Sequence, residues 1–153
     1  MKLMVRSLGI AGTILMLAGV QNASAQITNS IDFTTSFPFT VGNTAVPAGS
    51  YTITPDFDNP SILQLSGGHT AVLFETNTAQ AKETPSKTEV VFKRYGNGYV
   101  LKDVWLEGDS TGAETLALEG EKHMASRLGP AAEQRVTAQK KGASTPSRTS
   151  GHR

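Results

Sequence analysis

Hydrophobic and polar residues alternate along much of the chain after residue 30, which is the pattern of half-buried β-strands. In Ile31–Val41, isoleucine, phenylalanine and valine occupy odd-numbered positions, whereas Asp32, Thr34, Ser36 and Thr40 occupy even-numbered ones. Pro38 lies in this segment at an even-numbered position. Because proline lacks the N–H that a central strand donates, we expect an edge strand or a bulge there.

Shorter alternating segments follow, separated by glycine, proline, aspartate and asparagine, which are typical turn residues. Gly96-Asn97-Gly98 separates two such segments and predicts a β-hairpin. Residues 70–75 and 99–106 are apolar on both faces, which predicts interior strands. The polar residues 77–87 predict a long loop. The expected strands after the first are 51–54, 61–66, 70–75, 89–95 and 99–106.

After residue 112 the spacing of apolar residues approaches that of a helix. Thr111 and Glu114 have the spacing of a capping box. We expect a short extended segment at 115–118, followed by a helix over Glu119–Leu128. The whole pattern predicts a mainly β fold: a small antiparallel β-sandwich or barrel of about six or seven strands with a short C-terminal helix and a disordered tail.

The N-terminus has the layout of a secretory signal peptide. Lys2 and Arg6 precede the apolar segment Leu8–Val20, and Ala23-Ser24-Ala25 follows as a cleavage site. The apolar segment has 13 residues, fewer than the roughly 20 that a transmembrane helix needs. We therefore expect residues 1–25 to be removed, an exported protein in the periplasm or outside the cell, and no transmembrane span in the mature chain.

The mature chain is expected to contain one β-rich domain, residues 26–128, and a disordered basic tail, residues 129–153. The tail has five basic residues and one acidic residue, so its net charge is +4, whereas that of residues 26–128 is −5. The basic charges are sparse and have no aromatic residues among them, which disfavours nucleic-acid binding. The chain has no cysteine, so a core without disulfides must stabilise it.

Two stretches carry the motifs FxVGxxxxPAGxY, from Phe39 to Tyr51, and RYGxxYxLxxVW, from Arg94 to Trp105. The chain thereby resembles a group of short, exported, uncharacterised β-rich bacterial proteins. The resemblance implies export and a single β-rich domain, and it implies no activity. In that group a leucine-proline step and a serine cap precede the helix, and both are missing from residues 116–119 of this chain. Pro47 and Gly49 suit a turn, and the Tyr51 hydroxyl is expected to bond nearby backbone.

No motif for catalysis, cofactor binding or metal binding is apparent, so we assign no catalytic, cofactor or metal residue. Asp56, Asp58 and Asn59 offer oxygen ligands that calcium uses, although such residues are also common in turns. Phe57 lies among them; an exposed aromatic in a loop can stack on a sugar, but we favour Phe57 folding back on the sheet edge. The three histidines, His69, His123 and His152, lack the spacing of metal ligands. Five acidic residues are candidates for the paired carboxylates of glycoside hydrolysis, as almost any β-domain would offer: Glu75, Glu89, Asp103, Glu107 and Asp109.

Asp103 is expected to share a face with Tyr99, Leu101 and Trp105, and therefore to need a partner such as Lys93 or Arg94. Three functions remain open. The first is a non-enzymatic envelope domain that binds a protein or a glycan. The second is a small-ligand carrier of the barrel type, and the third is a hydrolase. The carrier needs an empty interior, which a large inward set disfavours: Phe33, Phe37, Phe39, Phe74, Phe92 and Trp105.

Overall fold

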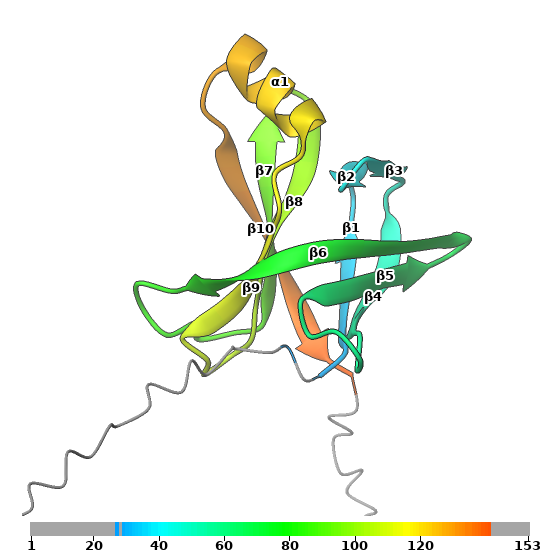
Figure 1. Cartoon of the computed structure of the whole chain (residues 1–153), viewed down its shortest axis with the longest axis vertical. Helices are drawn as coiled ribbons and strands as arrows, with labels where there is room; N and C mark the ends of the chain where they lie inside the picture. The colour runs from blue at the N-terminus through cyan, green and yellow to red at the C-terminus, as the bar shows by residue number, and fades with distance from the viewer. Residues whose placement is uncertain (1–26, 28, 142–153) are drawn as a thin grey trace, which may run out of the picture.

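The computed structural model describes Ile27 and residues 29–141, so the predicted signal peptide lies outside the described residues. Ten strands and one helix form within this part of the chain (Figure 1). They are β1 (Ile31–Thr35), β2 (Phe39–Val41), β3 (Thr44–Val46), β4 (Gly49–Pro55), β5 (Ile62–Gly67), β6 (Thr70–Gln80), β7 (Glu89–Tyr95), β8 (Gly98–Trp105), β9 (Thr111–Thr115), α1 (Glu119–Leu128) and β10 (Ala132–Lys140).

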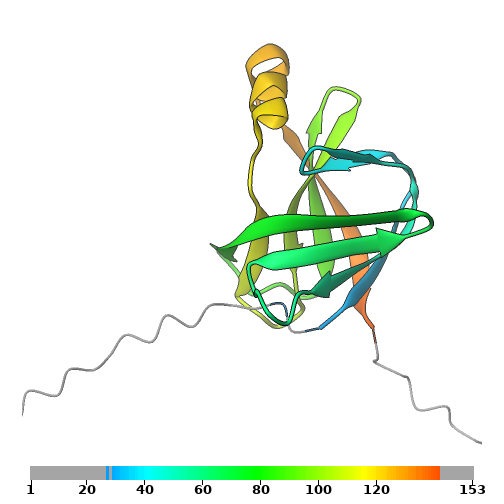
Figure 2. The ribbon, with the colours of Figure 1, turned by 45° about the vertical axis from the view of Figure 1, so that its right-hand side comes forward.

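Eight of the strands close into an antiparallel barrel, in the order β8-β7-β10-β1-β4-β5-β6-β9, with β9 returning to β8. The long strand β6 pairs with β5 through its first half and with β9 through its second half. The hairpin of β2 and β3 lies outside the barrel, joined to β8 by a parallel pairing of Thr40 with Val100. Figure 2 shows β5 and β6 crossing the front of the barrel. Of the predicted alternatives, the barrel is therefore confirmed.

Large apolar side chains fill the inside of the barrel. Phe33, Phe39, Phe74 and Phe92 belong to the core, and Phe37 packs against it, as the alternation predicts. Trp105 is buried but lies outside this cluster, which corrects the prediction that it faces inward. The largest fully buried side chains come from five strands of the barrel, β1, β4, β5, β7 and β8, and from the outer β2–β3 hairpin: Ile31, Val41, Val46, Ile53, Leu63, Leu65, Val90, Val91, Phe92, Leu101 and Val104.

The first predicted strand is divided around Pro38 into β1 and β2, which corrects the expectation of one edge strand or a bulge: β1 is paired with both β10 and β4, and no strand runs through the proline, which lacks an N–H to donate. The strand β1 ends at Thr35, whose hydroxyl donates a hydrogen bond of 3.0 Å to the carbonyl oxygen of Phe37. The chain then turns, and β2 begins at Phe39. The ring of Phe37 stacks on that of Tyr99 with 4.0 Å between the ring centroids, so the turn is held against β8.

The predicted disordered tail is wrong over Ala132–Lys140, which forms β10 and lies between β1 and β7. The domain therefore extends beyond the predicted end at Leu128, whereas residues 142–153 lie outside the described part. Of the residues of β10, only Val136 and Ala138 pack in or against the core, so the segment needs few apolar residues. Its backbone hydrogen bonds to β1 and β7 hold it in the sheet, although its side chains bury little apolar surface.

Other expectations near the loops need correction. The strand β6 continues to Gln80, into the region predicted as a loop, because β9 pairs with it. Leu73 is 63% exposed, so β6 is not buried on both faces. Thr111 and Glu114 lie in β9 and do not form a capping box.

The predicted helix is confirmed as α1, although Leu118 at its N-cap makes no side-chain capping bond. The helix ends before Gly129, whose φ of 81° suits glycine. Within the described part of the chain, no helix has both the length and the apolar composition that a membrane span requires.

Candidate functional site

A cleft of about 620 Å³ lies on the outer face of the barrel, over β7, β8 and β10. The segment between β6 and β7 forms one wall, and outward side chains of the three strands form the floor. The β-strands make the floor rigid because each is paired on both sides. The lining residues are Gln80, Ala81, Lys82, Glu83, Thr84, Pro85, Ser86, Glu89, Lys102, Asp103, Trp105, Glu133 and Arg135.

A β-bulge in β8 shapes this floor. Val91 pairs with Asp103, but the next residue of β7, Phe92, pairs with Leu101, so Lys102 is the extra residue. A bulge redirects side chains that strict alternation would place on opposite faces. Accordingly, the Lys102 ammonium lies 3.2 Å from Oδ2 of the adjacent Asp103 on the outer face.

The bulge also overturns the predicted face of Asp103. Leu101 belongs to the core of the barrel, whereas Asp103 and Trp105 line the outer cleft. The partner of Asp103 is therefore Lys102 rather than Lys93 or Arg94. Lys93 instead forms an ion pair of 2.6 Å with Glu121 of α1, which also accepts a hydrogen bond from Tyr95.

Five charged side chains form a continuous chain of alternating sign across the floor. Arg135 donates to Glu89 at 2.6 Å and to Glu133 at 3.0 Å. Lys102 donates to the other carboxylate oxygen of Glu133 at 2.6 Å and also contacts Asp103. Glu89 and Asp103 are only 6% and 5% exposed, so these pairs keep two buried carboxylates from being isolated charges.

The surroundings shift the pKa values of this network in different directions. Burial raises the pKa of Asp103, and Lys102 only partly offsets this effect. Hydrogen bonds from Lys102 and then Arg135 lower the pKa of Glu133, against a smaller opposing effect of burial. Burial alone would lower the pKa values of both bases, but their carboxylate partners raise them. Lys102 and Arg135 therefore remain charged at neutral pH.

Trp105, the single tryptophan of the chain, lines the cleft together with the two buried carboxylates. It is opposite Glu89 in the β7–β8 ladder. Its ring packs against Gly112 of β9, where an added Cβ would lie only 2.4 Å from Cε3 of the indole. Because Gly112 has no side chain, the indole can pack directly against β9, and it is 8% exposed.

Asp56, Asp58 and Asn59, the candidate calcium ligands, form a turn. Oδ1 of Asp56 accepts the backbone N–H groups of Asp58 and Asn59 at 2.8 and 3.1 Å, which closes a turn. Phe57 is 91% exposed and does not fold back on the sheet. Across Ile27 and residues 29–141, no group of three or more acidic or histidine side chains is arranged to hold a metal ion.

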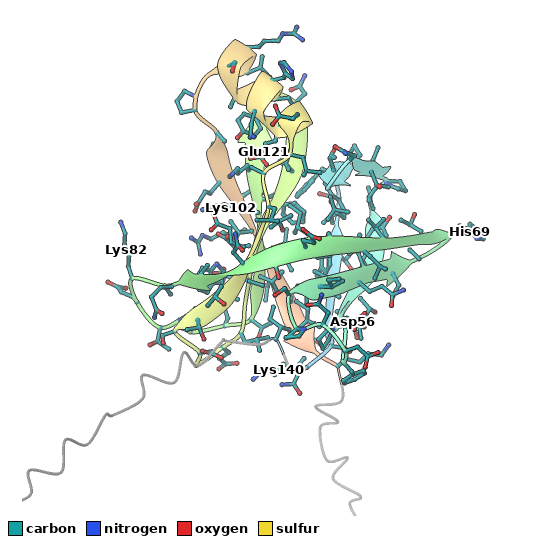
Figure 3. The ribbon with its side chains drawn as sticks, viewed as in Figure 1. Asp56, His69, Lys82, Lys102, Glu121 and Lys140 are labelled. Carbon is teal, nitrogen blue, oxygen red and sulfur yellow. The ribbon has the colours of Figure 1, made fainter. Side chains whose placement is uncertain are left out.

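The other residues singled out in the sequence are dispersed. His69 lies at the tip of the β5–β6 hairpin, far from Lys102 in Figure 3. His123 lies in α1, and His152 lies outside the described residues. Glu75 and Glu107 are exposed away from the floor of the cleft.

Two of the singled-out residues have structural roles. Asp109 accepts hydrogen bonds from the hydroxyl and the backbone N–H of Thr111, and these bonds lower its pKa. The expected bond of Tyr51 is confirmed, since its hydroxyl donates to the carbonyl oxygen of Pro47 at 2.7 Å.

Of the five predicted carboxylate candidates, the structure therefore brings Glu89 and Asp103 into one site. The sequence analysis did not identify Lys102, Glu133 and Arg135. Glu133 and Arg135 belong to the charged segment that was predicted as a tail, and Lys102 lies in β8, where only the bulge places it beside Asp103. No protein family, curated protein or solved structure matches this chain. Because no comparison indicates a function, the functional proposal rests on the cleft over β7, β8 and β10.

Proposed function

We propose that the protein is an exported, non-enzymatic binding domain of the cell envelope, and that it binds an envelope protein or glycan through the charged outer cleft. The observation that carries the proposal is a filled barrel with a polar cleft of about 620 Å³ on its outside. Small-molecule sites commonly enclose about 300–1,000 Å³, so the cleft is large enough to hold part of a partner.

The filled interior favours this function over a small-ligand carrier. Carriers of the barrel type hold their ligand inside the barrel, where Phe33, Phe74 and Phe92 lie in this protein. A pocket of about 230 Å³ lies between the β2–β3 turn, β6 and residues 115–118. This volume is below the common range for ligand sites.

A second groove, of about 560 Å³, crosses the outer faces of β1, β4, β5 and β10. Its polar side chains already bond one another: Thr34 with Ser50 at 2.9 Å, and Thr52 with Asp32 at 2.6 Å. It has no tryptophan and no pair of buried carboxylates among its lining residues. The cleft over β7, β8 and β10 is therefore the better binding site.

The ion pairs of the cleft favour binding over hydrolysis. Glycoside hydrolysis needs one carboxylic acid and one carboxylate at a set separation around the bond that is cleaved. Glu89 is held by Arg135 and Asp103 by Lys102. Each of these cations fixes its carboxylate in place and balances its negative charge, which suits recognition of a partner.

Affinity capture from an envelope extract tests the proposal. The baits are the mature chain 26–153, a chain ending at Lys141, and mature chains with Glu89→Gln or Asp103→Asn. We expect the first two baits to retain the same partner and the cleft variants to lose it. Retention by all four baits, or by none, would contradict binding through the cleft. A partner lost only from the shorter chain would assign binding to residues 142–153 and would also contradict it.

A further inference from the structure

The cleft offers hydrogen-bond acceptors and donors in alternation. Along the chain Glu89–Arg135–Glu133–Lys102–Asp103, every carboxylate neighbours a cation at 2.6–3.2 Å. An ionised carboxylate only accepts hydrogen bonds, whereas ammonium and guanidinium groups only donate them. A hydroxyl group does both. Neighbouring hydroxyl groups of a sugar ring can therefore donate to a carboxylate and accept from the adjacent cation.

The two buried carboxylates retain unused acceptor capacity. Oε1 of Glu89 accepts from Arg135, and Oδ2 of Asp103 contacts Lys102. Each ionised carboxylate has about four lone-pair sites on two oxygens. Because both residues line the cleft, their remaining sites are available to a donor within it.

The balance of charge favours a neutral ligand. The lining residues include three cations, Lys82, Lys102 and Arg135, and four anions, Glu83, Glu89, Asp103 and Glu133. A site for a polyanion or a polycation would have one dominant sign, because like charges repel a ligand of that sign. Mixed signs at close spacing disfavour both kinds of polymer.

The cleft also has apolar surface and a fixed shape. Trp105 and Pro85 line it beside the charged groups. Ligand sites typically combine such apolar surface with a few placed polar groups that orient the ligand. The bulge at Lys102 and the ion pairs hold these polar groups before any ligand arrives, which lowers the entropic cost of binding.

We propose that the cleft binds a neutral, polyhydroxylated glycan segment, with Glu89 and Asp103 accepting hydrogen bonds from its hydroxyl groups and Lys102 and Arg135 donating to them. This inference rests on the proposed function, since it assigns a ligand class to the same cleft. A cleft-dependent protein partner in the capture experiment would leave the proposed function intact and would contradict the glycan.

Trp105 makes the test specific to the site, because it is the only tryptophan of the chain and lines the cleft. The mature protein is titrated with three neutral oligosaccharides, maltohexaose, cellohexaose and chitohexaose, while tryptophan fluorescence is recorded. The charged probes are hexagalacturonate and fully deacetylated chitosan hexamer. We expect a saturable change with at least one neutral probe and weaker binding of both charged probes.

Asp103→Asn and Glu89→Gln should each weaken binding of that neutral probe at least tenfold. Glu119→Gln is the matched control, because Glu119 is exposed in α1 and is not among the residues that line the cleft. Circular dichroism and urea unfolding show whether each variant is folded, and folded variants are the ones compared. No saturable change with any neutral probe, tighter binding of a charged probe, or equal affinities of the cleft variants and the control would overturn the inference.

Discussion

Replacement of Phe92 by alanine tests whether the aromatic residues inside the barrel are the centre of its stability. Phe92 is completely buried and belongs to β7. Its ring centroid lies 6.3, 5.2 and 5.1 Å from those of Phe33, Phe37 and Phe39. One substitution therefore removes ring contacts with β1, with β2 and with the turn between them.

Truncation of a buried phenylalanine to alanine typically costs about 3–5 kcal/mol. Aromatic pairs contribute about 0.5–1.5 kcal/mol each beyond the area they bury, so three pairs place Phe92 near the upper end, about 5 kcal/mol. Phe57→Ala is the matched control. Because Phe57 is 91% exposed, its loss should change the free energy of unfolding by less than about 0.5 kcal/mol.

Urea unfolding, followed by Trp105 fluorescence and circular dichroism, measures both changes. A lower midpoint at constant slope indicates lost stability without a change in the unfolded state. Phe92→Leu retains part of the volume and provides a folded comparison if the alanine variant does not fold; we expect its loss to lie between those of the other two variants. A loss below about 1 kcal/mol for Phe92→Ala would refute the described core.

Three further predictions concern β10, the glycines and the buried aspartate. A chain ending at Leu128 lacks β10 and leaves β1 and β7 unpaired there, so it should show no cooperative urea transition, whereas a chain ending at Lys141 should show one. Gly112→Ala should lower stability by about 1–3 kcal/mol through its clash with Trp105, whereas Gly120→Ala in α1, with open space around it, should raise stability by about 0.5–1 kcal/mol; equal urea midpoints would contradict both. Because burial raises the pKa of Asp103 in the folded state, its contribution to stability is complete below about pH 4 and is lost as the pH rises through the folded pKa. As the pH is raised from about 4 to 7, the free energy of unfolding of Asp103→Asn should therefore increase relative to that of the natural chain. A relative decrease over this range would contradict a raised pKa of Asp103.

Local patterns predicted the local structure well. The alternation in residues 31–41 predicted extended structure with the correct inward side chains, and Pro38 indicated an irregularity, although the segment forms two strands and not one. The glycine-rich turn at 96–98 predicted the β7–β8 hairpin, and the helical spacing predicted α1 with its observed bounds. Each of these features depends on neighbouring residues, whose periodicity and turn chemistry are present in the sequence itself.

Long-range pairing decided the rest. β10 has few apolar residues, and it is a strand because β1 and β7, distant in the sequence, provide backbone partners on both sides. The bulge at Lys102 follows from the pairing of β7 with β8, and it moved Asp103 and Trp105 to the outer face. The candidate site was therefore hidden from the sequence. Its five charged residues come from three strands, and the pairing of β7 with β8 and with the distant β10 brings them within hydrogen-bonding distance.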